Sequence, residues 1–197
     1  MSTPEQTPPP SHTPDRARVF VVSGPTAVGK GTVCARLRER HPEVFVSVSV
    51  TTRDPRPGEV DGVHYHFVSD EQFDELIDND GLLEWALVHR RARYGTPRQP
   101  VEDAVARGQV VILEIDLQGA RQVRHSYPQA RHIFLAPPNW DELVRRLVGR
   151  GTETAEQQAE RLETAKRELE AIKEFDEVVT NGEIEETVDR LVELTGL

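Results

Sequence analysis

The sequence predicts an α/β fold in which helices cover both faces of a mainly parallel sheet, a three-layer sandwich. Short apolar runs rich in β-branched residues alternate with helical patterns from Arg18 onward, and this alternation is typical of a parallel sheet. The runs are continuously apolar, as in strands that are buried on both faces. A length of 197 residues with 37% hydrophobic residues is enough for one packed core domain.

The core strands are expected at the apolar runs 19–22, 110–113, 132–135 and, more briefly, 178–179. Helical patterns are found at 30–40, 98–107, 117–126, 139–149 and 184–194. Gly108 suits the end of the second of these helices. Asn139 with Glu142 three residues later is a capping-box pattern, which predicts the start of the fourth.

Two stretches interrupt this alternation. Residues 44–50 and 63–68 alternate apolar with polar side chains, which predicts antiparallel strands that partly face solvent. Ser69 and Gln72 then cap a helix of about ten residues. The second stretch, 150–172, is strongly charged and helical. We interpret 49–96 as a small mixed α+β substrate-binding insertion, 150–172 as a mobile lid, and 16–48, 97–149 and 173–197 as the core.

The N-terminal segment, the apolar runs and the cysteine content indicate the cellular compartment of the protein. Five of residues 1–15 are proline and no apolar period appears there, so we expect a disordered tail. No apolar run approaches the roughly 20 residues that span a bilayer, and no signal pattern opens the chain. Cys34 is the single cysteine, which agrees with a reducing compartment. We therefore expect a cytoplasmic protein without membrane contact, either a monomer or a small homo-oligomer.

The formal net charge of −10 disfavours broad binding to nucleic acid, which needs a basic footprint. A protein of this charge that binds phosphates must focus its arginines on one site.

A glycine-rich segment follows the first buried strand and precedes a helix, which is the context of a P-loop. Its residues are Ser23, Gly24, Pro25, Thr26, Ala27, Val28, Gly29, Lys30, Gly31 and Thr32. The glycines let backbone N–H groups surround a phosphate, the helix N-terminus adds positive potential, and Lys30 reaches the outer phosphates. Gly31 stands where the common motif has Ser or Thr for magnesium, which leaves the magnesium ligand open. The plain alternative is an ordinary glycine-rich turn.

Several charged residues could complete a phosphate site. Arg53 and Arg56 lie three residues apart in a turn-rich stretch, and guanidinium groups match phosphate oxygens well. A solvated charged loop is the alternative. Glu114 and Asp116 end the predicted strand 110–115, and ligands gather beyond the carboxyl ends of such strands.

Three arginines fall on the predicted helix at 139–149 and in the predicted lid. Arg146 and Arg150 lie four residues apart on one helix face, and Arg161 follows. A salt-bridged surface helix is the alternative, because Glu153, Glu156, Glu160 and Glu163 are near.

These motifs, taken in order, resemble the guanylate kinase family over nearly all of residues 18–195. The matching segments are 24–32, 51–56, 58–62, 65–67, 84–86, 94–96, 114–119 and 149–154. The resemblance implies a P-loop nucleoside monophosphate kinase with a GMP-binding insertion. It also implies direct in-line transfer from ATP, with Mg²⁺ as cofactor, to GMP or dGMP.

The resemblance also assigns roles to individual residues. It places Arg53, Arg56, Tyr65 and Tyr94 on the GMP phosphate, Glu84 on guanine N1–H and the 2-amino group, and Ser49 and Thr96 near the base. It places Asp116 near the acceptor and, through water, near magnesium, with Glu114 where some members have Asp. It places Asn181 near adenine, and makes Lys30, Arg53, Arg146, Arg150 and Arg161 the catalytic set.

Alternatives remain open at this level. Tyr65 could be a packing aromatic and Ser49 a strand-edge hydroxyl. The whole chain could be a guanylate-kinase-like binding module without turnover, although the lysine and arginines are all present. It could also be a related P-loop kinase with a sugar-phosphate or another nucleotide as acceptor.

Overall fold

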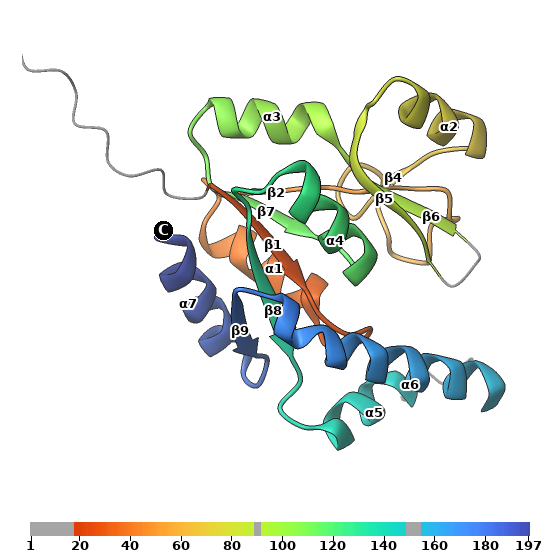
Figure 1. The fold of residues 1–197 in the computed structure, drawn as a ribbon, viewed down its shortest axis with the longest axis vertical. Helices are drawn as coiled ribbons and strands as arrows, with labels where there is room; N and C mark the ends of the chain where they lie inside the picture. The colour runs from red at the N-terminus through yellow and green to blue at the C-terminus, as the bar shows by residue number, and fades with distance from the viewer. Residues whose placement is uncertain (1–17, 89–91, 149–154) are drawn as a thin grey trace, which may run out of the picture.

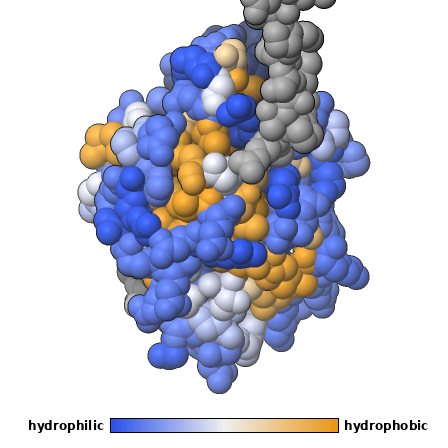
Figure 2. Space-filling view, turned by 90° about the vertical axis from the view of Figure 1, so that its left-hand side faces the viewer, coloured by the Kyte–Doolittle hydropathy of each residue, from blue (hydrophilic) through white to orange (hydrophobic). Residues whose placement is uncertain are grey.

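The computed structural model describes residues 18–88, 92–148 and 155–197 (Figure 1). The tail expected at 1–15, Arg150 and the motif at 149–154 lie outside the described residues. None of the helices in the described part of the chain is long and apolar enough to cross a membrane. Figure 2 shows one face of the molecule, on which hydrophilic residues surround smaller hydrophobic patches.

A five-stranded parallel sheet forms the centre of the molecule, as predicted. Its strands are β1 (Val19–Ser23), β2 (Phe45–Val46), β7 (Val111–Glu114), β8 (Arg131–Ala136) and β9 (Glu177–Thr180). Their order in space is β2-β7-β1-β8-β9, which puts β1 in the middle. All of β1 is buried, as its continuous apolar run predicts for a strand covered on both faces.

Helices cover the two faces of this sheet. One face carries α1 (Lys30–Arg40), α5 (Trp140–Val148), α6 (Ala155–Glu170) and α7 (Ile184–Thr195), and the other carries α3 (Arg98–Ala106) and α4 (Leu117–Ser126). Phe20 and Val22 pack with the first set, whereas Val19 and Val21 pack with the second. This follows from strand geometry, because successive side chains point to opposite faces. The predicted three-layer sandwich is confirmed.

A second sheet of four strands lies in the predicted insertion, at the upper right of Figure 1. It consists of β3 (Val50–Thr51), β4 (His66–Phe67), β5 (Leu82–Val88) and β6 (Ala92–Pro97), in the order β4-β3-β6-β5, and α2 (Asp70–Asp78) accompanies it. Phe73 of α2 is fully buried and packs with Val50 and Leu82. The insertion therefore has a small hydrophobic core of its own.

Two predictions about strands in this region are wrong. Residues 44–50 do not form one strand, because the Ser47 N–H donates to Ile112 of the core sheet (2.9 Å) while the Ser49 carbonyl accepts from His66 of the second sheet (2.8 Å). Residues 63–68 are not antiparallel to that segment, since β4 pairs with β3 in parallel. Antiparallel pairing does occur, because β6 pairs in this way with β3, which begins at Val50, and with β5; the sequence patterns did not identify β5 or β6. An alternating pattern shows which face of a strand is buried, but not which partner the strand pairs with.

Helix ends form as the local sequence predicts. The Ser69 hydroxyl accepts from the Gln72 N–H (3.2 Å), and the Gln72 side chain accepts from the Ser69 N–H (2.9 Å), which completes the capping box of α2. Asn139 caps α5 by accepting from the Glu142 N–H at 2.9 Å. Gly108 has a φ of 75° after α3, where a left-handed residue lets the chain leave the helix.

The charged stretch at 150–172 contains α6 and the start of a 3₁₀ turn, Ala171–Glu174. Ala165 of α6 is fully buried, and Leu162 and Leu169 pack against the main core. In Figure 1, α6 runs along the lower right of the molecule beside α5. The inner face of this helix is thus part of the core, and its closing as a lid stays a prediction.

Candidate active site

The loop that connects β1 to α1 has the backbone shape of a phosphate cradle. Gly24 and Gly29 have φ of 153° and 104°, and Ala27 has a φ of 65°. A Cβ on Gly24 would lie 2.2 Å from the Leu135 carbonyl oxygen, and one on Gly29 would lie 2.6 Å from Asn181 Nδ2. Gly29 is also the N-cap of α1 and provides no side-chain cap. The first N–H groups of this helix can therefore receive an anion.

Lys30 extends back along this loop from the first turn of α1. Its Nζ donates to the carbonyl oxygens of Gly24 (2.7 Å) and Pro25 (3.3 Å). The ammonium group is thereby held beside the amides of the cradle, where it adds a positive charge to the helix N-terminus.

Asn181, a predicted ATP-site residue, and Arg146, a predicted catalytic residue, support the loop through one carbonyl group. The Val28 oxygen accepts from Asn181 Nδ2 (2.7 Å) and from an Arg146 guanidinium nitrogen (2.9 Å). Asn181 also accepts from the Thr187 hydroxyl (3.1 Å), and Arg146 forms an ion pair with Glu142 (2.9 Å). Both side chains therefore position the P-loop, and their contacts with ATP stay predictions.

Arg53 is held in one orientation by neighbours from the insertion. Its Nε donates to the Tyr94 hydroxyl (3.0 Å), and its two terminal nitrogens donate to the two carboxylate oxygens of Glu59 (3.0 and 2.9 Å). The Tyr65 ring lies 5.4 Å from the guanidinium carbon, and burial raises the pKa of Tyr65 to about 12. Glu59 also accepts from the backbone N–H of Arg56 (2.7 Å). The Arg53 guanidinium group and two phenols therefore converge, and Glu59 ties the Arg56 backbone to them.

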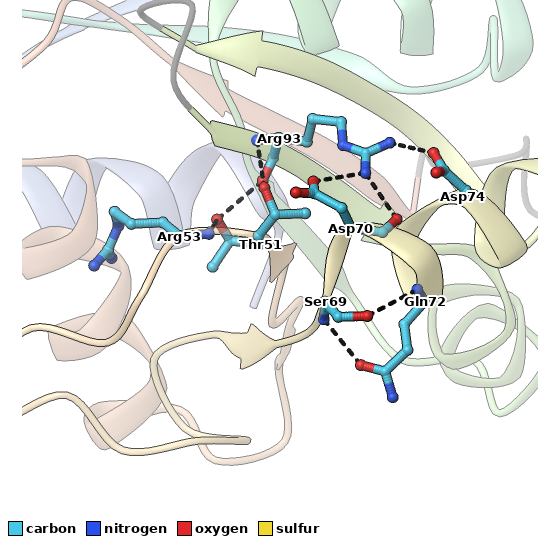
Figure 3. Close-up of polar contacts among 8 residues, drawn as sticks. Thr51, Arg53, Ser69, Asp70, Gln72, Asp74 and Arg93 are labelled. Atoms are coloured by element: carbon cyan, nitrogen blue, oxygen red, sulfur yellow. Dashed lines mark hydrogen bonds and ion pairs between the residues drawn. The ribbon is translucent and has the colours of Figure 1, made fainter.

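Arg93 is a supporting residue that the sequence analysis missed (Figure 3). Its guanidinium group binds the side chains of Asp70 and Asp74 on α2, and its carbonyl accepts from the Thr51 hydroxyl (2.9 Å). That hydroxyl in turn accepts from the Arg53 N–H (3.2 Å). A chain of contacts thus runs from α2 through β6 to Arg53. Two aspartates four residues apart on one helix face were the available signal.

Glu84 is a buried carboxylate on β5, with 5% of its surface exposed. Its Oε1 accepts from the Thr96 hydroxyl at 2.7 Å. Burial raises the pKa of Glu84 to about 7, and the nearby charge of Asp116 acts in the same direction, while Thr96 opposes the shift. Such a group is poised to accept hydrogen bonds from a ligand.

Helix α4 fits closely against Glu84. A Cβ on Gly119 would lie 2.4 Å from Glu84 Oε2, so this position leaves no room for a side chain. Asp116 caps the helix by accepting from the Gly119 N–H (2.8 Å). The Gln122 side chain binds both peptide groups of Trp85, accepting from its N–H (3.2 Å) and donating to its carbonyl (2.6 Å). Gln122 and Gly119 were not predicted to act here, although Gly119 is within a matched motif.

Glu114 lies beside Gly31, the position at which the chain departs from the common P-loop motif. A Cβ on Gly31 would lie 3.4 Å from Glu114 Oε1, which is an ordinary van der Waals contact. Burial raises the pKa of Glu114, and the charge of Lys30 opposes the shift. In the described residues, no group of three acidic, His or Cys side chains is arranged to hold a metal. The oxygens of Thr32, Glu114 and Asp116 suit Mg²⁺ that arrives with phosphates and keeps several waters.

One cleft of about 1210 Å³ brings most of the predicted residues together. The predicted residues that line it are Thr26, Ala27, Gly29, Lys30, Gly31, Thr32, Ser49, Arg53, Arg56, Tyr65, Glu84, Tyr94, Glu114, Asp116 and Arg161. Its lining does not include Gly24, Pro25, Val28, Thr96, Arg146 or Asn181, all of them described residues. It also includes residues that were not predicted, namely Thr52, Asp54, Ala86, Val88, Ala92, Ile115 and Glu160.

A phosphate cradle at the end of the middle strand of a parallel sheet faces convergent arginine and tyrosine side chains across this cleft. Fold and site together define a P-loop kinase that acts on a small phosphorylated acceptor. A family model described as "Guanylate kinase" matches residues 16–195. The chain belongs to the guanylate kinase family.

Individual relatives agree with this assignment. The chain is 65% identical over 179 residues to the guanylate kinase of Cutibacterium acnes, which covers 91% of this chain and 90% of that protein. It is 58% identical over 182 residues to the guanylate kinase of Streptomyces coelicolor, which covers 92% of each. The crystal structure of guanylate kinase from Anaplasma phagocytophilum matches with a TM-score of 0.74 at 35% identity, over 92% of this chain and 86% of that one.

Proposed function

We propose that this protein transfers the terminal phosphate of ATP to GMP, with dGMP as a second acceptor, and releases ADP and GDP. The observation that carries the proposal is one cleft that contains both the P-loop with Lys30 and the group formed by Arg53, Tyr94 and Glu84. Membership of the guanylate kinase family supports the same reaction.

The chemistry is an in-line attack of a GMP phosphate oxygen on the γ-phosphorus of ATP. The two anions repel each other, so catalysis rests on positioning them and on neutralising the charge that develops. The P-loop N–H groups and Lys30 hold the phosphates of ATP. Arg53 and Arg56, with Tyr65 and Tyr94, hold the phosphate of GMP. The contacts of Arg53 with Glu59 and Tyr94 favour this role, because they orient the guanidinium group before the substrate arrives.

Glu84 supplies the preference for guanine. An ionised carboxylate accepts from guanine N1–H and the 2-amino group, whereas adenine has no donor pair at that edge. With AMP bound, the buried carboxylate would lack partners, and each unmatched polar group costs about 1–3 kcal/mol. Ser49, which lines the cleft, and Thr96, which holds Glu84, complete the base site.

Magnesium would be held by the phosphates and, through water, by Asp116, with Glu114 and Thr32 nearby. When bound, it neutralises phosphate charge. Arg161 already lines the cleft, so it is placed to contact phosphates. One terminal nitrogen of Arg146 holds the Val28 carbonyl, so a phosphate contact through that nitrogen would have to replace this hydrogen bond. Arg150 belongs to the same proposed catalytic set.

The setting of the enzyme completes the proposal. We place it in the cytoplasm, as a monomer or small homo-oligomer that binds neither membranes nor nucleic acids. The acidic net charge and the single cysteine support this placement.

A coupled assay of ADP release tests the function, with GMP, dGMP, AMP, CMP and UMP offered separately. We expect turnover with GMP and dGMP and at least about tenfold less with AMP, as expected for one or two unpaired polar groups. Absence of turnover with every acceptor would instead support a binding module. Equal rates with all five would contradict recognition of the base by Glu84.

A further inference from the structure

A contact between the far end of α6 and the P-loop has no role in the function proposed so far. Glu168 Oε2 accepts from the backbone N–H of Thr26 at 2.9 Å, across 142 residues of sequence. Glu168 is partly buried, and it belongs to the same helix as Arg161. Thr26 is near the tip of the phosphate cradle and lines the cleft.

The part of the loop that Glu168 holds has an uncommon backbone conformation. Ala27, the next residue after Thr26, has a φ of 65°, which residues other than glycine rarely adopt. Such a conformation persists when surrounding contacts fix it. Asn181 and Arg146 hold the carbonyl of Val28 on one side of Ala27, and Glu168 holds the N–H of Thr26 on the other.

A carboxylate is an unexpected residue beside a cradle for phosphates. It adds a negative charge where two anions must bind, and burial disfavours its charged form. Burial raises the pKa of Glu168, while its hydrogen bond with the Thr26 N–H and the charge of Lys30 oppose the shift. An apolar side chain would pack here without these penalties, so the hydrogen bond to Thr26 needs a reason beyond packing.

The geometry of α6 provides that reason. Arg161 and Glu168 are seven residues apart and therefore share one face of the helix. Between them Ala165 is fully buried, which anchors that face on the core. Helix α6 thus presents Arg161 to the cleft, two turns away from Glu168, which accepts a hydrogen bond from the P-loop.

We propose that Glu168 is a positioning residue that holds the tip of the P-loop in its phosphate-binding shape and keeps Arg161 in register with it. The role in transfer rests on the proposed function, but the effect on the P-loop does not depend on the acceptor.

Three substitutions of Glu168 distinguish the effect of side-chain length from the effect of side-chain charge. Glu168→Ala removes the acceptor, Glu168→Asp keeps the charge but shortens the side chain, and Glu168→Gln keeps an oxygen at the original reach without the charge. Glu163→Ala is the matched control, because Glu163 is exposed on the same helix and, among the described residues, its side chain has only a 3.8 Å ion pair with Lys166.

The measurements are the KM for ATP at saturating GMP, the KM for GMP at saturating ATP, and the Kd for MgADP by calorimetry. We expect the Ala and Asp variants to raise the KM for ATP and the Kd for MgADP about tenfold, as for loss of one buried hydrogen bond. The KM for GMP should change less than about twofold, and Gln should stay within about threefold of wild type on every measure.

Several outcomes would overturn the proposal. The Ala and Asp variants could bind MgADP as wild type does, or Asp could outperform Gln, which would make charge rather than reach the important property. Equal losses for ATP and GMP that follow the melting temperature would indicate a role in stability alone. If Ala does not fold, the comparison of Asp with Gln decides. Absence of GMP turnover by wild type would contradict the proposed function, while MgADP binding would still test Glu168.

Discussion

Under the proposed function, the phosphate cradle and the insertion would bind similar anions by different means. The cradle is a run of consecutive residues, 24–32, and it would bind mainly through backbone N–H groups that glycines place. The insertion would bind through side chains such as Arg53, Glu84 and Tyr94, which come from separate segments and are supported by Arg93, Gly119 and Gln122. A site made of backbone is encoded locally, whereas a site made of side chains depends on long-range packing.

The largest effect should come from Lys30, the one side chain of the cradle with a full charge. We expect Lys30→Ala to lower kcat at least about hundredfold, since it removes a preorganised charge from the transition state. The melting temperature should fall by only a few degrees, because the buried residues of β1 and α1 are unchanged. Residual activity within about tenfold of wild type would show that the amides suffice.

In the insertion, Glu84→Gln should reduce the ratio of kcat/KM for GMP over AMP by about 10- to 100-fold, since the amide presents a donor to guanine donors. Because the pKa of Glu84 is about 7, the wild-type KM for GMP should fall as the pH rises from 6 to 8. The Gln variant should show no such trend. An unchanged ratio would mean that Glu84 does not contact the base.

Although Glu84→Gln should impair recognition of GMP, it should increase the stability of the fold at high pH. The pKa of Glu84 is higher in the folded state (about 7) than its ordinary value of 4.5, so the fold disfavours the charged form. The contribution of Glu84 to the free energy of unfolding is fully present below pH 4.5 and is lost as the pH rises through 7. Urea unfolding should therefore find Glu84→Gln more stable than wild type by about 1–3 kcal/mol at pH 8, with no difference at pH 4.

Gly119→Ala tests the long-range packing of the insertion without replacing a binding side chain. The added Cβ would meet Glu84 Oε2 at 2.4 Å and displace it, so the KM for GMP should rise about tenfold while the KM for ATP stays constant. Gly182→Ala is the control, since a Cβ there would have no atom of the described residues within 4 Å apart from its chain neighbours. Equal effects on both substrates would show that α4 does not separate the two sites.

The smallest effect concerns the core sheet. His132 is 1% exposed, and burial lowers its pKa to about 4, helped by the charge of Arg124 and opposed by Asp176. Below about pH 6.5, His132 therefore binds a proton in the unfolded chain but not in the folded chain, until the pH approaches 4. Between pH 7 and pH 5, the free energy of unfolding of wild type should fall by about 1–2 kcal/mol more than that of His132→Leu, as measured by urea unfolding.

Activity at pH 7 should not change in this variant, because the cleft lining does not include His132. An identical loss of stability with falling pH in both proteins would show that other groups cause the acid sensitivity.

The local parts of the molecule could be predicted from sequence. The helices at 30–40 and 117–126 begin and end where expected, and the P-loop and the capping box of Ser69 follow from neighbouring residues. The strands at 44–50 and 63–68 could not be assigned correctly, because strand pairing depends on residues far away in the chain.

The sequence by itself determined the alternation of strands and helices, the cradle and the candidate ligand-binding residues, since these depend on side-chain chemistry and short-range geometry. Only the tertiary structure decided that Thr51 links Arg93 to the backbone of Arg53, that Gly119 makes room for Glu84, and that Glu168 accepts a hydrogen bond from Thr26. Each of these contacts joins segments whose distance in space is set by the packing of the whole chain, and no local pattern encodes that distance.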